Sequence, residues 1–464
     1  MRRPAADASP DTGDAILFRP IVTTGPSFYL GATALLAVAL WGLYAYTRQL
    51  RYGLGVTGLN RPVYWGFYIT NFVFFVGISH AGTLISAILR LSKAEWRRPI
   101  TRMAETITVL VLFFGLGSIL MDLGRPERFY FVIPFFWYGH LTSPLIWDVL
   151  SIGTYLTAST IYLYVPLIPD LALVRDRITG WRKGFYRVLS LGWTGSPKQH
   201  RALEIAIGIL AVLVIPIAVS VHTVVSWVFA MTIQPMWHST IFGPYFVVGA
   251  IFSGIAALII AMAIVRRVYH LEAYIKPVHF NYLGTLLLVM TLLWLYFTFA
   301  EYLTTYYGHE PKEMAVFWAK VNGPYRTVFW AMVLCDFIVP FVILANRKTR
   351  TVTGTVIASI SVSIGMWLER FTIIIPTLIN PRLDWPRGLY HPSWVEVSIT
   401  AGFFAAFALL YMVFTKFFPM VSIWEVREGR ERGIQDVQER LRGYLPDEVP
   451  AGGVSPAGEI HVIR

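Results

Sequence analysis

The chain contains 464 residues, of which 56% are apolar and only 14% are charged. Soluble proteins carry about 25% charged residues, so this composition excludes a water-soluble multi-domain protein and indicates one that crosses a membrane several times. The single cysteine, Cys335, excludes a disulfide framework, a cysteine-ligated iron–sulfur cluster, a cysteine-based zinc site and the CxxCH motif of covalent haem. A net charge of +12 would suggest nucleic acid in a soluble protein, but here the placement of the 39 Lys and Arg residues decides its meaning.

Ten stretches are long and apolar enough to cross a bilayer, whose core of about 30 Å needs about 20 helical residues. We therefore expect an all-α integral membrane protein with about ten transmembrane helices. The predicted spans are 26–47, 64–90, 103–121, 138–166, 203–230, 240–265, 281–304, 325–345, 353–376 and 394–418.

The Lys and Arg residues in the loops and at the span ends that border them predict an orientation. The segment before the first span and the even-numbered loops hold 21 of them, whereas the odd-numbered loops hold 10. The positive-inside rule therefore places both termini in the cytoplasm, and no nucleic-acid partner is expected. The first 25 residues contain Arg2, Arg3 and Arg19 but no apolar core or small-residue cleavage site, so we expect the first span to be a retained anchor.

Spans 2–5 align with spans 6–9, and this alignment matches polar residues within the membrane. The matches are Asp122 with Glu301, Asp148 with Asp336, and His222 with the Glu369–Arg370 pair. Because the blocks are an even number of spans apart, they predict a parallel repeat about an axis along the membrane normal. The alternative is that two hydrophobic blocks produce such matches by chance.

The repeat predicts two four-helix bundles, at 64–231 and 240–376. One flanking helix with its loop precedes them at 26–63, and another follows at 394–418. Residues 1–25 and 419–464 are predicted to be cytoplasmic, the latter as a solvated tail rather than a docking helix.

Ionisable residues inside a span cost several kcal/mol unless paired or hydrated, so each is a functional candidate. Asp148 lies about a third of the way into its span from the outer face; it is interpreted as a proton acceptor or ligand partner, with a polar clamp between helices as the alternative. The small residues around His80 permit either close helix packing or the approach of a flat ligand. Glu369 and Arg370 lie about 100° apart on a helix, so each is expected to face a different partner.

A haem held by two histidines is not expected. Such a haem needs two ring nitrogens that face each other at one depth, and only His80 and His222 lie well inside spans. Counting residues from the outer ends of their spans places His80 roughly 22 Å and His222 roughly 12 Å below the outer face. This difference predicts that the two rings do not meet.

Four stretches carry a resemblance to a known family: GISHAGTLISAILRL at 77–91, MDLGRPERF at 121–129, SPLIWDVLSIGTYL at 143–156 and GLYHPSWVEVSIT at 388–400. They resemble the large membrane subunit of alternative complex III, a member of the polysulfide-reductase membrane-subunit superfamily. The resemblance covers about residues 15–425.

This resemblance implies a subunit of a quinol:electron-acceptor oxidoreductase in the bacterial inner membrane, binding menaquinol or ubiquinol near the outer face of the first bundle. It implies an iron–sulfur partner subunit at that face, multihaem cytochrome c partners, surrounding lipid and other membrane subunits, including a homologous bundle subunit. The implied quinol-site residues are His80, Asp122 and Asp148, with His140 as a further binding candidate. A proton route is expected to use His222, Glu301, Asp336, Glu369 and Arg370.

The residue types agree with that chemistry. Quinol oxidation releases two protons and two electrons, and carboxylates and imidazoles are suitable proton acceptors. Because the chain has one cysteine, it cannot ligate an iron–sulfur cluster, so a partner must accept the electrons. We also expect the chain to bind no metal and no haem. The alternatives are a secondary transporter or ion channel, which also carries buried acids at repeat-related positions, and a membrane anchor whose acids are purely structural.

Overall fold

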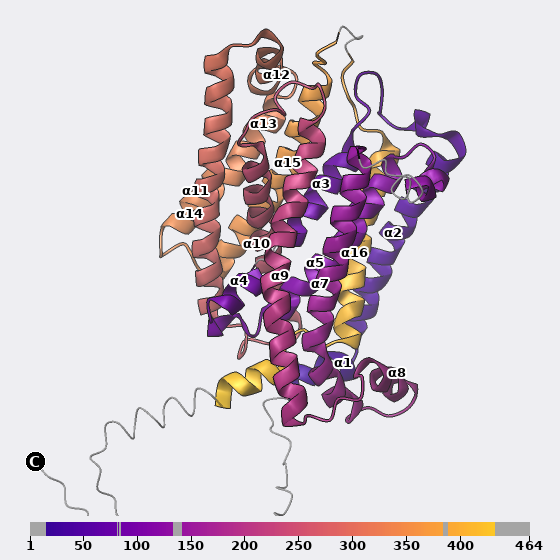
Figure 1. Cartoon of the computed structure of the whole chain (residues 1–464), viewed down its shortest axis with the longest axis vertical. Helices are drawn as coiled ribbons and strands as arrows, with labels where there is room; N and C mark the ends of the chain where they lie inside the picture. Colours follow the sequence, from indigo (N-terminus) through magenta and orange to yellow (C-terminus); the bar gives the residue numbers. More distant parts are fainter. Residues whose placement is uncertain (1–14, 81, 83–84, 133–141, 384–387, 432–464) are drawn as a thin grey trace, which may run out of the picture.

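The computed structural model describes residues 15–80, 82, 85–132, 142–383 and 388–431, and every regular element in these ranges is helical (Figure 1). Short 3₁₀ turns form at Leu54–Val56, Glu95–Arg97 and Pro126–Phe131. The longer elements are α1 (Ala15–Val22), α2 (Pro26–Tyr52), α3 (Phe67–His80), α4 (Ser86–Leu91), α5 (Thr101–Asp122), α7 (Pro144–Arg175), α8 (Trp181–Leu189), α9 (Pro197–Ala230), α10 (Phe242–Val268), α11 (Pro277–Gly308), α12 (Pro311–Val321), α13 (Arg326–Val333), the π-helical turn η5 (Leu334–Ile338), α14 (Val339–Ala345), α15 (Val352–Leu378) and α16 (Trp394–Phe417).

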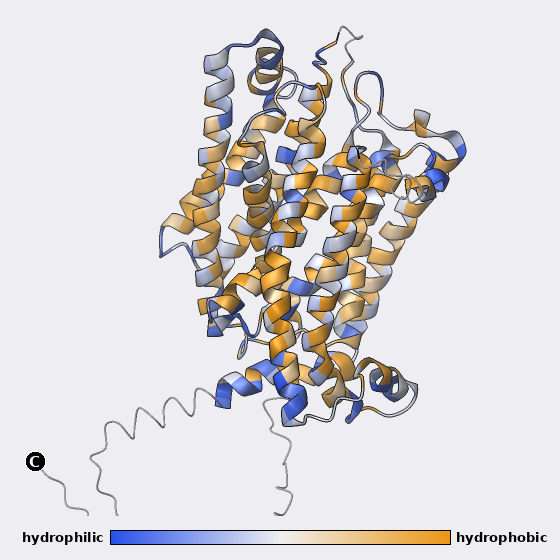
Figure 2. Cartoon of the chain, viewed as in Figure 1, coloured by the Kyte–Doolittle hydropathy of each residue, from blue (hydrophilic) through white to orange (hydrophobic). Residues whose placement is uncertain are grey.

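The expectation of an all-α integral membrane protein with about ten helices is confirmed. Within the described ranges, nine helical segments are long and apolar enough to cross a membrane, namely α2, α5, α7, α9, α10, α11, α13 to α14, α15 and α16. The predicted span 64–90 forms the two shorter helices α3 and α4 instead. Figure 2 shows apolar residues along the lengths of the helices and polar residues gathered at the two ends of the helical body.

The two ends of the helical body differ in which segments they carry. The start of α2, the end of α16, α1, α8 and the helix at 423–431 all lie at one end, at the bottom of Figure 1. We call this end the terminal side and the opposite end the far side.

The helices pack as two groups. The first helix group contains α3, α4, α5, α7 and α9, and the second contains α10, α11, α13, α14 and α15. Helix α10 also packs against α3 and α9, and α15 packs against α3, so these four helices join the groups. The predicted bundle boundaries and the repeat relation between the two bundles stay predictions.

The two flanking helices, α2 and α16, pack against each other although they lie at opposite ends of the sequence. A Cβ atom on Gly42 would lie 2.8 Å from the Cα of Gly402 and 2.9 Å from the carbonyl oxygen of Ser398. Small residues allow this close approach, which dispersion forces then stabilise, because lipid supplies no hydrophobic drive for helix association. Neither apolar stretch indicates its partner, so the sequence did not predict this pairing.

The chain beyond α16 packs against the helical body as far as residue 431, so the expectation of a solvated tail is wrong for this part. Met420, Val421 and Ile423 are buried, and residues 423–431 form a helix. The carboxylate of Asp170 on α7 accepts hydrogen bonds from the backbone N–H groups of Ile423 (3.1 Å) and Trp424 (3.0 Å). Asp170 therefore caps the start of this helix.

The close crossing of α2 and α16 predicts that Gly42→Ala destabilises the protein by about 1–3 kcal/mol, because the added methyl group forces the two backbones apart. Gly208→Ala on α9 is the matched control, since a Cβ there meets nothing within 4 Å. This control should be neutral or stabilising by up to about 1 kcal/mol through helix propensity. Thermal unfolding in detergent measures both, and equal midpoints for the two variants would contradict the close packing.

Candidate functional site

The second predicted span changes its helix type after His80. Helix α3 is α-helical as far as His80, residues 82 and 85 have π-helical geometry, and α4 begins at Ser86. The carbonyl oxygen of Ser79 accepts hydrogen bonds from the hydroxyls of Thr108 (2.6 Å) and Tyr155 (2.9 Å). Gly82 lies so close to α5 that a Cβ would stand 1.9 Å from a backbone carbonyl oxygen of that helix. Of the two alternatives for the small residues around His80, the structure therefore supports close helix packing.

The imidazole of His80 connects α3 to α9. Its Nε2 lies 2.6 Å from the carbonyl oxygen of Ala218, and its Nδ1 lies 3.4 Å from that of Val76. The shorter contact places the proton of a neutral ring on Nε2, which then donates to α9. The ring is fully buried. Only Nδ1, whose contact is long, keeps a lone pair for another donor.

His222 lies against His80, so the expectation that they occupy different depths is wrong. The ring centroids are 4.0 Å apart at an interplanar angle of 61°. Counting residues from span ends assumes that all spans start in one plane and lie upright in the membrane, and the ring contact shows that these two helices do not. Both ring nitrogens of His222 are buried and lack a hydrogen-bond partner within the described part of the chain.

Glu369 and Arg370 form an ion pair, so the expectation that each faces a different partner is wrong. Arg370 Nη1 lies 2.7 Å from Glu369 Oε2, and both side chains are 1% exposed. The flexible arginine side chain spans the angle between neighbouring helical positions. Glu369 Oε1 accepts a hydrogen bond from the indole N–H of Trp294 on α11 (2.6 Å). The guanidinium lies over the ring of Phe246 (5.0 Å) and occupies space that a Cβ on Gly249 would fill.

Asp336 lies fully buried on the π-helical turn η5. Neither of its carboxylate oxygens has a hydrogen-bond partner among the described residues. Gly365 of α15 faces it, and a Cβ there would lie 2.3 Å from Oδ1. The positive charge of Arg370 acts on both Asp336 and His222. We call the set formed by these residues the central cluster: His80, His222, Asp336, Glu369 and Arg370.

The central cluster contains more buried polar atoms than its protein neighbours satisfy. The nitrogens of His222 and the oxygens of Asp336 are examples from the two helix groups. Ordered water is the usual partner of buried polar groups for which the protein supplies none. Hydrated imidazoles and carboxylates inside a membrane can accept protons and pass them on.

A second polar site lies in the second helix group on the far side. Glu301 and Lys320 line a cavity of about 20 Å³, which has room for about one water molecule. A carboxylate oxygen of Glu301 accepts a hydrogen bond from the hydroxyl of Ser239. Lys320, on α12 outside the membrane spans, is 4% exposed. Burial lowers the pKa of Lys320 to about 8, although the negative charges of Glu301 and Glu369 oppose this effect.

Asp148 is a buried carboxylate in the first helix group. It is 5% exposed, and its Oδ1 has no hydrogen-bond partner among the described residues. The ring of Tyr155 on α7 lies next to the ring of His80. Asp148 lies two turns before Tyr155 on the same helix, or about 10 Å away along the helix axis. Asp148 and His80 therefore belong to one helix group at different depths. The further candidate His140 lies outside the described residues.

Asp122, the last residue of α5, is not part of the central cluster. Its Oδ1 is buried without a partner in the described ranges, and the charge of Glu396 acts on it. Glu396 caps α16 together with Ser393 and accepts a hydrogen bond from the hydroxyl of Tyr390 (2.6 Å). The sequence analysis missed Glu396, although the S-x-x-E pattern at Ser393 predicts such a capping box.

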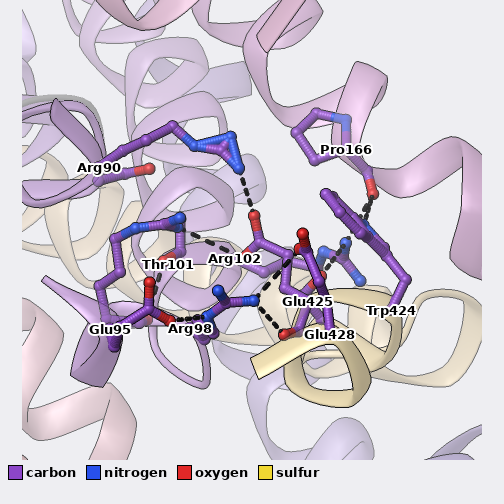
Figure 3. A network of polar contacts seen from close by, with 12 residues as sticks. Arg90, Glu95, Arg98, Thr101, Arg102, Pro166, Trp424, Glu425 and Glu428 are labelled. Carbon is purple, nitrogen blue, oxygen red and sulfur yellow. Dashed lines mark hydrogen bonds and ion pairs between the residues drawn. The ribbon is translucent and has the colours of Figure 1, made fainter. Parts of the chain in front are cut away.

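An ionic network on the terminal side joins the first helix group to the C-terminal segment (Figure 3). Arg102 pairs with Asp170, and both side chains are almost fully buried. Arg90 and Arg97 pair with Glu425 at 2.6 Å and 3.4 Å. The sequence analysis missed Asp170 because the predicted span ends at 166, whereas α7 continues to residue 175.

Glu105 is a further buried acid that the sequence analysis missed. It accepts a hydrogen bond from the hydroxyl of Ser86 (2.7 Å), which lies 3.2 Å from the hydroxyl of Tyr162. A cavity of about 10 Å³ adjoins these residues. Glu105 lies inside the predicted span 103–121, so the rule that selected Asp148 would also have selected it.

These features define a class of protein: a multi-pass helical membrane protein in which buried acids and histidines gather where two helix groups meet. Residues 55–381 match the family described as polysulphide reductase, NrfD, and the chain belongs to this family. The superfamily suggested by the four sequence stretches is thereby confirmed.

Relatives cover nearly the whole chain at low identity. The chain is 25% identical over 432 residues to a putative membrane subunit of dimethyl sulfoxide reductase from Halobacterium salinarum, covering 88% of this chain and 95% of the relative. It is 24% identical over 446 residues to the Hdr-like menaquinol oxidoreductase integral membrane subunit from Archaeoglobus fulgidus, covering 92% and 100%. It is also 24% identical over 399 residues to the menaquinone reductase integral membrane subunit from Nitratidesulfovibrio vulgaris, covering 82% and 88%.

The burial of Lys320 predicts a pH-dependent stability. Folding lowers its pKa from 10.5 to about 8. The unfolded chain therefore holds this proton over a pH range in which the folded chain has lost it, so stability rises between about pH 8 and pH 10.5, by about 3 kcal/mol. We expect this rise to be absent in Lys320→Met and kept in the control Lys348→Met, which changes an exposed lysine. Thermal unfolding across this pH range measures it, and parallel profiles for wild type and Lys320→Met would contradict it.

The contact between His80 and His222 predicts that the chain binds no b-type haem between them. With ring centroids 4.0 Å apart, no porphyrin fits between the two imidazoles. The chain purified without partners should show no haem absorbance and no pyridine haemochrome. One haem per chain, lost in His222→Ala, would contradict the geometry.

Proposed function

We propose that the chain is the quinol-binding membrane subunit of an electron-transfer complex, of the kind found in alternative complex III. In this role it oxidises menaquinol or ubiquinol, and a partner subunit accepts the electrons. Membership of the NrfD family supports this role, as do relatives whose names carry menaquinol oxidoreductase and menaquinone reductase. The observation that carries it is the buried Asp148 carboxylate, whose Oδ1 has no hydrogen-bond partner among the described residues and can accept one from a quinol hydroxyl.

The proposed quinol site lies in the far-side part of the first helix group. Asp148 is the proton acceptor in this proposal, and Asp122 and His140 are further binding candidates. The Nε2–H of His80 donates to Ala218, so His80 acts through its Nδ1 or as a group deeper than the quinone ring. Sequence motifs and buried unsatisfied atoms support the assignment of these residues.

The partners follow from what the chain lacks. Its single cysteine cannot ligate an iron–sulfur cluster, so the electron acceptor must belong to a partner. In the proposed assembly, as the resemblance to alternative complex III implies, an iron–sulfur subunit at the far side takes the electrons and multihaem cytochrome c partners pass them on. Other membrane subunits, including one with a homologous bundle, complete the assembly. The excess of Lys and Arg on the terminal side supports a location in the bacterial cytoplasmic membrane with that side in the cytoplasm.

We also propose that the central cluster conducts protons. His222 and Asp336 have buried atoms without protein partners in the described ranges, and the Glu369–Arg370 pair lies with them where the two helix groups meet. Glu301 continues the series of acids toward the far side. This arrangement gives the released protons polar groups to occupy inside the membrane.

A secondary transporter or channel is the alternative function. Irregular helices in both helix groups favour it: residues 82 and 85, between α3 and α4, have π-helical geometry, and the π-helical turn η5 lies within the α13–α14 span. These irregularities fall in the second and eighth spans, however, which are not partners in the predicted repeat. Family membership also favours electron transfer. A structural anchor would leave turnover unchanged when its buried acids are replaced.

Replacement of the proposed proton acceptor should lower turnover. We expect Asp148→Asn to reduce quinol oxidation by the purified complex about 100-fold, because the amide cannot accept a proton, and His80→Ala to reduce it about tenfold. Asp176→Asn, at an exposed acid on the terminal side, is the control and should retain full turnover. Size-exclusion chromatography checks assembly, and wild-type activity in both His80→Ala and Asp148→Asn would refute the site.

A further inference from the structure

A cavity of about 390 Å³ opens on the terminal side between α1, α2, α10 and α16. Its walls are mainly apolar and include Ile264 and Val268 of α10 and Met412 of α16. Ile264 and Val268 are 57% and 59% exposed, so this wall faces outward from the helical body. Because α10 and α16 both end here, the cavity connects the polar edge of the membrane with its apolar interior.

Two cationic side chains line this cavity, and neither has an acidic partner among the described residues. Arg19 is exposed, and its guanidinium makes no ion pair there. Lys416 Nζ donates to the backbone carbonyls of Pro20 (3.0 Å) and Thr23 (3.1 Å) and lies 4.8 Å from the ring centroid of Phe28. These dipoles and the ring hold the ammonium group in place without neutralising its charge. Among the described residues, therefore, no acid neutralises the two positive charges of this cavity.

Further hydrogen-bond donors meet in the same cavity. Gly25 and Ser27 line it at the start of α2, where no side chain of the described residues caps the helix. Pro26 has no N–H and the N–H of Phe28 donates to the carbonyl oxygen of Gly25 (3.1 Å), so the N–H groups of Gly25 and Ser27 are the donors beside the cavity. Uncapped helix N-termini favour anions through their free N–H groups and the helix dipole. The hydroxyl of Tyr411, which also lines the cavity, is buried without a hydrogen-bond partner in the described ranges. Buried donors are normally satisfied, so a ligand atom is expected to complete its bonding.

We propose that this cavity binds the phosphate group of an anionic phospholipid, with an acyl chain lying along the apolar wall of α10 and α16. Arg19 and Lys416 supply the charge, the start of α2 supplies backbone donors, and Tyr411 donates to a headgroup or ester oxygen. A free phosphate ion would use the donors but leave the outward apolar wall without a partner. A basic pocket between transmembrane helices at the membrane edge is the usual setting for an anionic lipid.

The test uses the full-length chain, delipidated in mild detergent and titrated with dioleoyl phosphatidylglycerol while native mass spectrometry follows binding. Dioleoyl phosphatidylcholine is the zwitterionic control. We expect the wild type to prefer phosphatidylglycerol and Arg19→Gln to weaken its binding about fivefold, the effect of one basic residue near a lipid surface. Tyr411→Phe should weaken it by a similar factor. The matched control Arg267→Gln removes an exposed charge on the same side that does not line the cavity, and it should bind like the wild type.

Three outcomes would overturn the proposal. Equal binding of the two lipids by the wild type would show that the cavity does not recognise the negative charge of the lipid. Equal weakening by Arg19→Gln and Arg267→Gln would assign the preference to general surface charge rather than to this cavity. Displacement of phosphatidylglycerol by an equal concentration of inorganic phosphate would show that the hydrogen-bond donors of the cavity bind a free ion and not a lipid.

Discussion

An ionisable side chain inside a membrane must find its partner within the protein, because lipid offers neither a counter-charge nor a hydrogen bond. Arg102 meets Asp170 across α5 and α7, and Glu369 meets both Arg370 and the Trp294 indole of α11. Most of these contacts connect different helices, so satisfying a polar group also sets how two helices pack. Asp170 shows the effect most fully, since it binds Arg102 and caps the helix at 423–431, drawing the C-terminal segment onto the first helix group.

In the central cluster only some of the polar atoms have a partner within the protein. In this it differs from the ionic network of the terminal side. His80 is tied to Ala218, whereas the His222 nitrogens and the Asp336 oxygens have no protein partner in the described ranges. The helices pack closely here, since Gly365 faces the Asp336 carboxylate and Gly82 lies against α5. Buried polar atoms without protein partners suit water and protons, which supports the proposal of proton conduction where the two helix groups meet.

Much of the architecture could be predicted because it depends on local composition. The apolar stretches located the helices, and single residues such as Asp148 and His80 were recognised as buried from their positions within spans. Contacts between spans were not predictable in this way. The His80–His222 contact was missed because residue counting cannot include helix length and tilt, and the Glu369–Arg370 pair was missed because a long side chain reaches beyond its own helical position. Glu105 shows a different failure, since its location within a span was available and was overlooked.

The sequence by itself determined that this is an all-helical membrane protein of about ten spans, which family it resembles, and which ionisable residues fall within its apolar stretches. These properties follow from hydropathy and short motifs, which one stretch of chain carries alone. Only the tertiary structure decided that α2 pairs with α16, that His80 meets His222, and that the chain beyond α16 packs on the first helix group. Each of these depends on shape and charge matching between distant segments, because lipid solvates all apolar helix faces alike and hydropathy cannot select a partner.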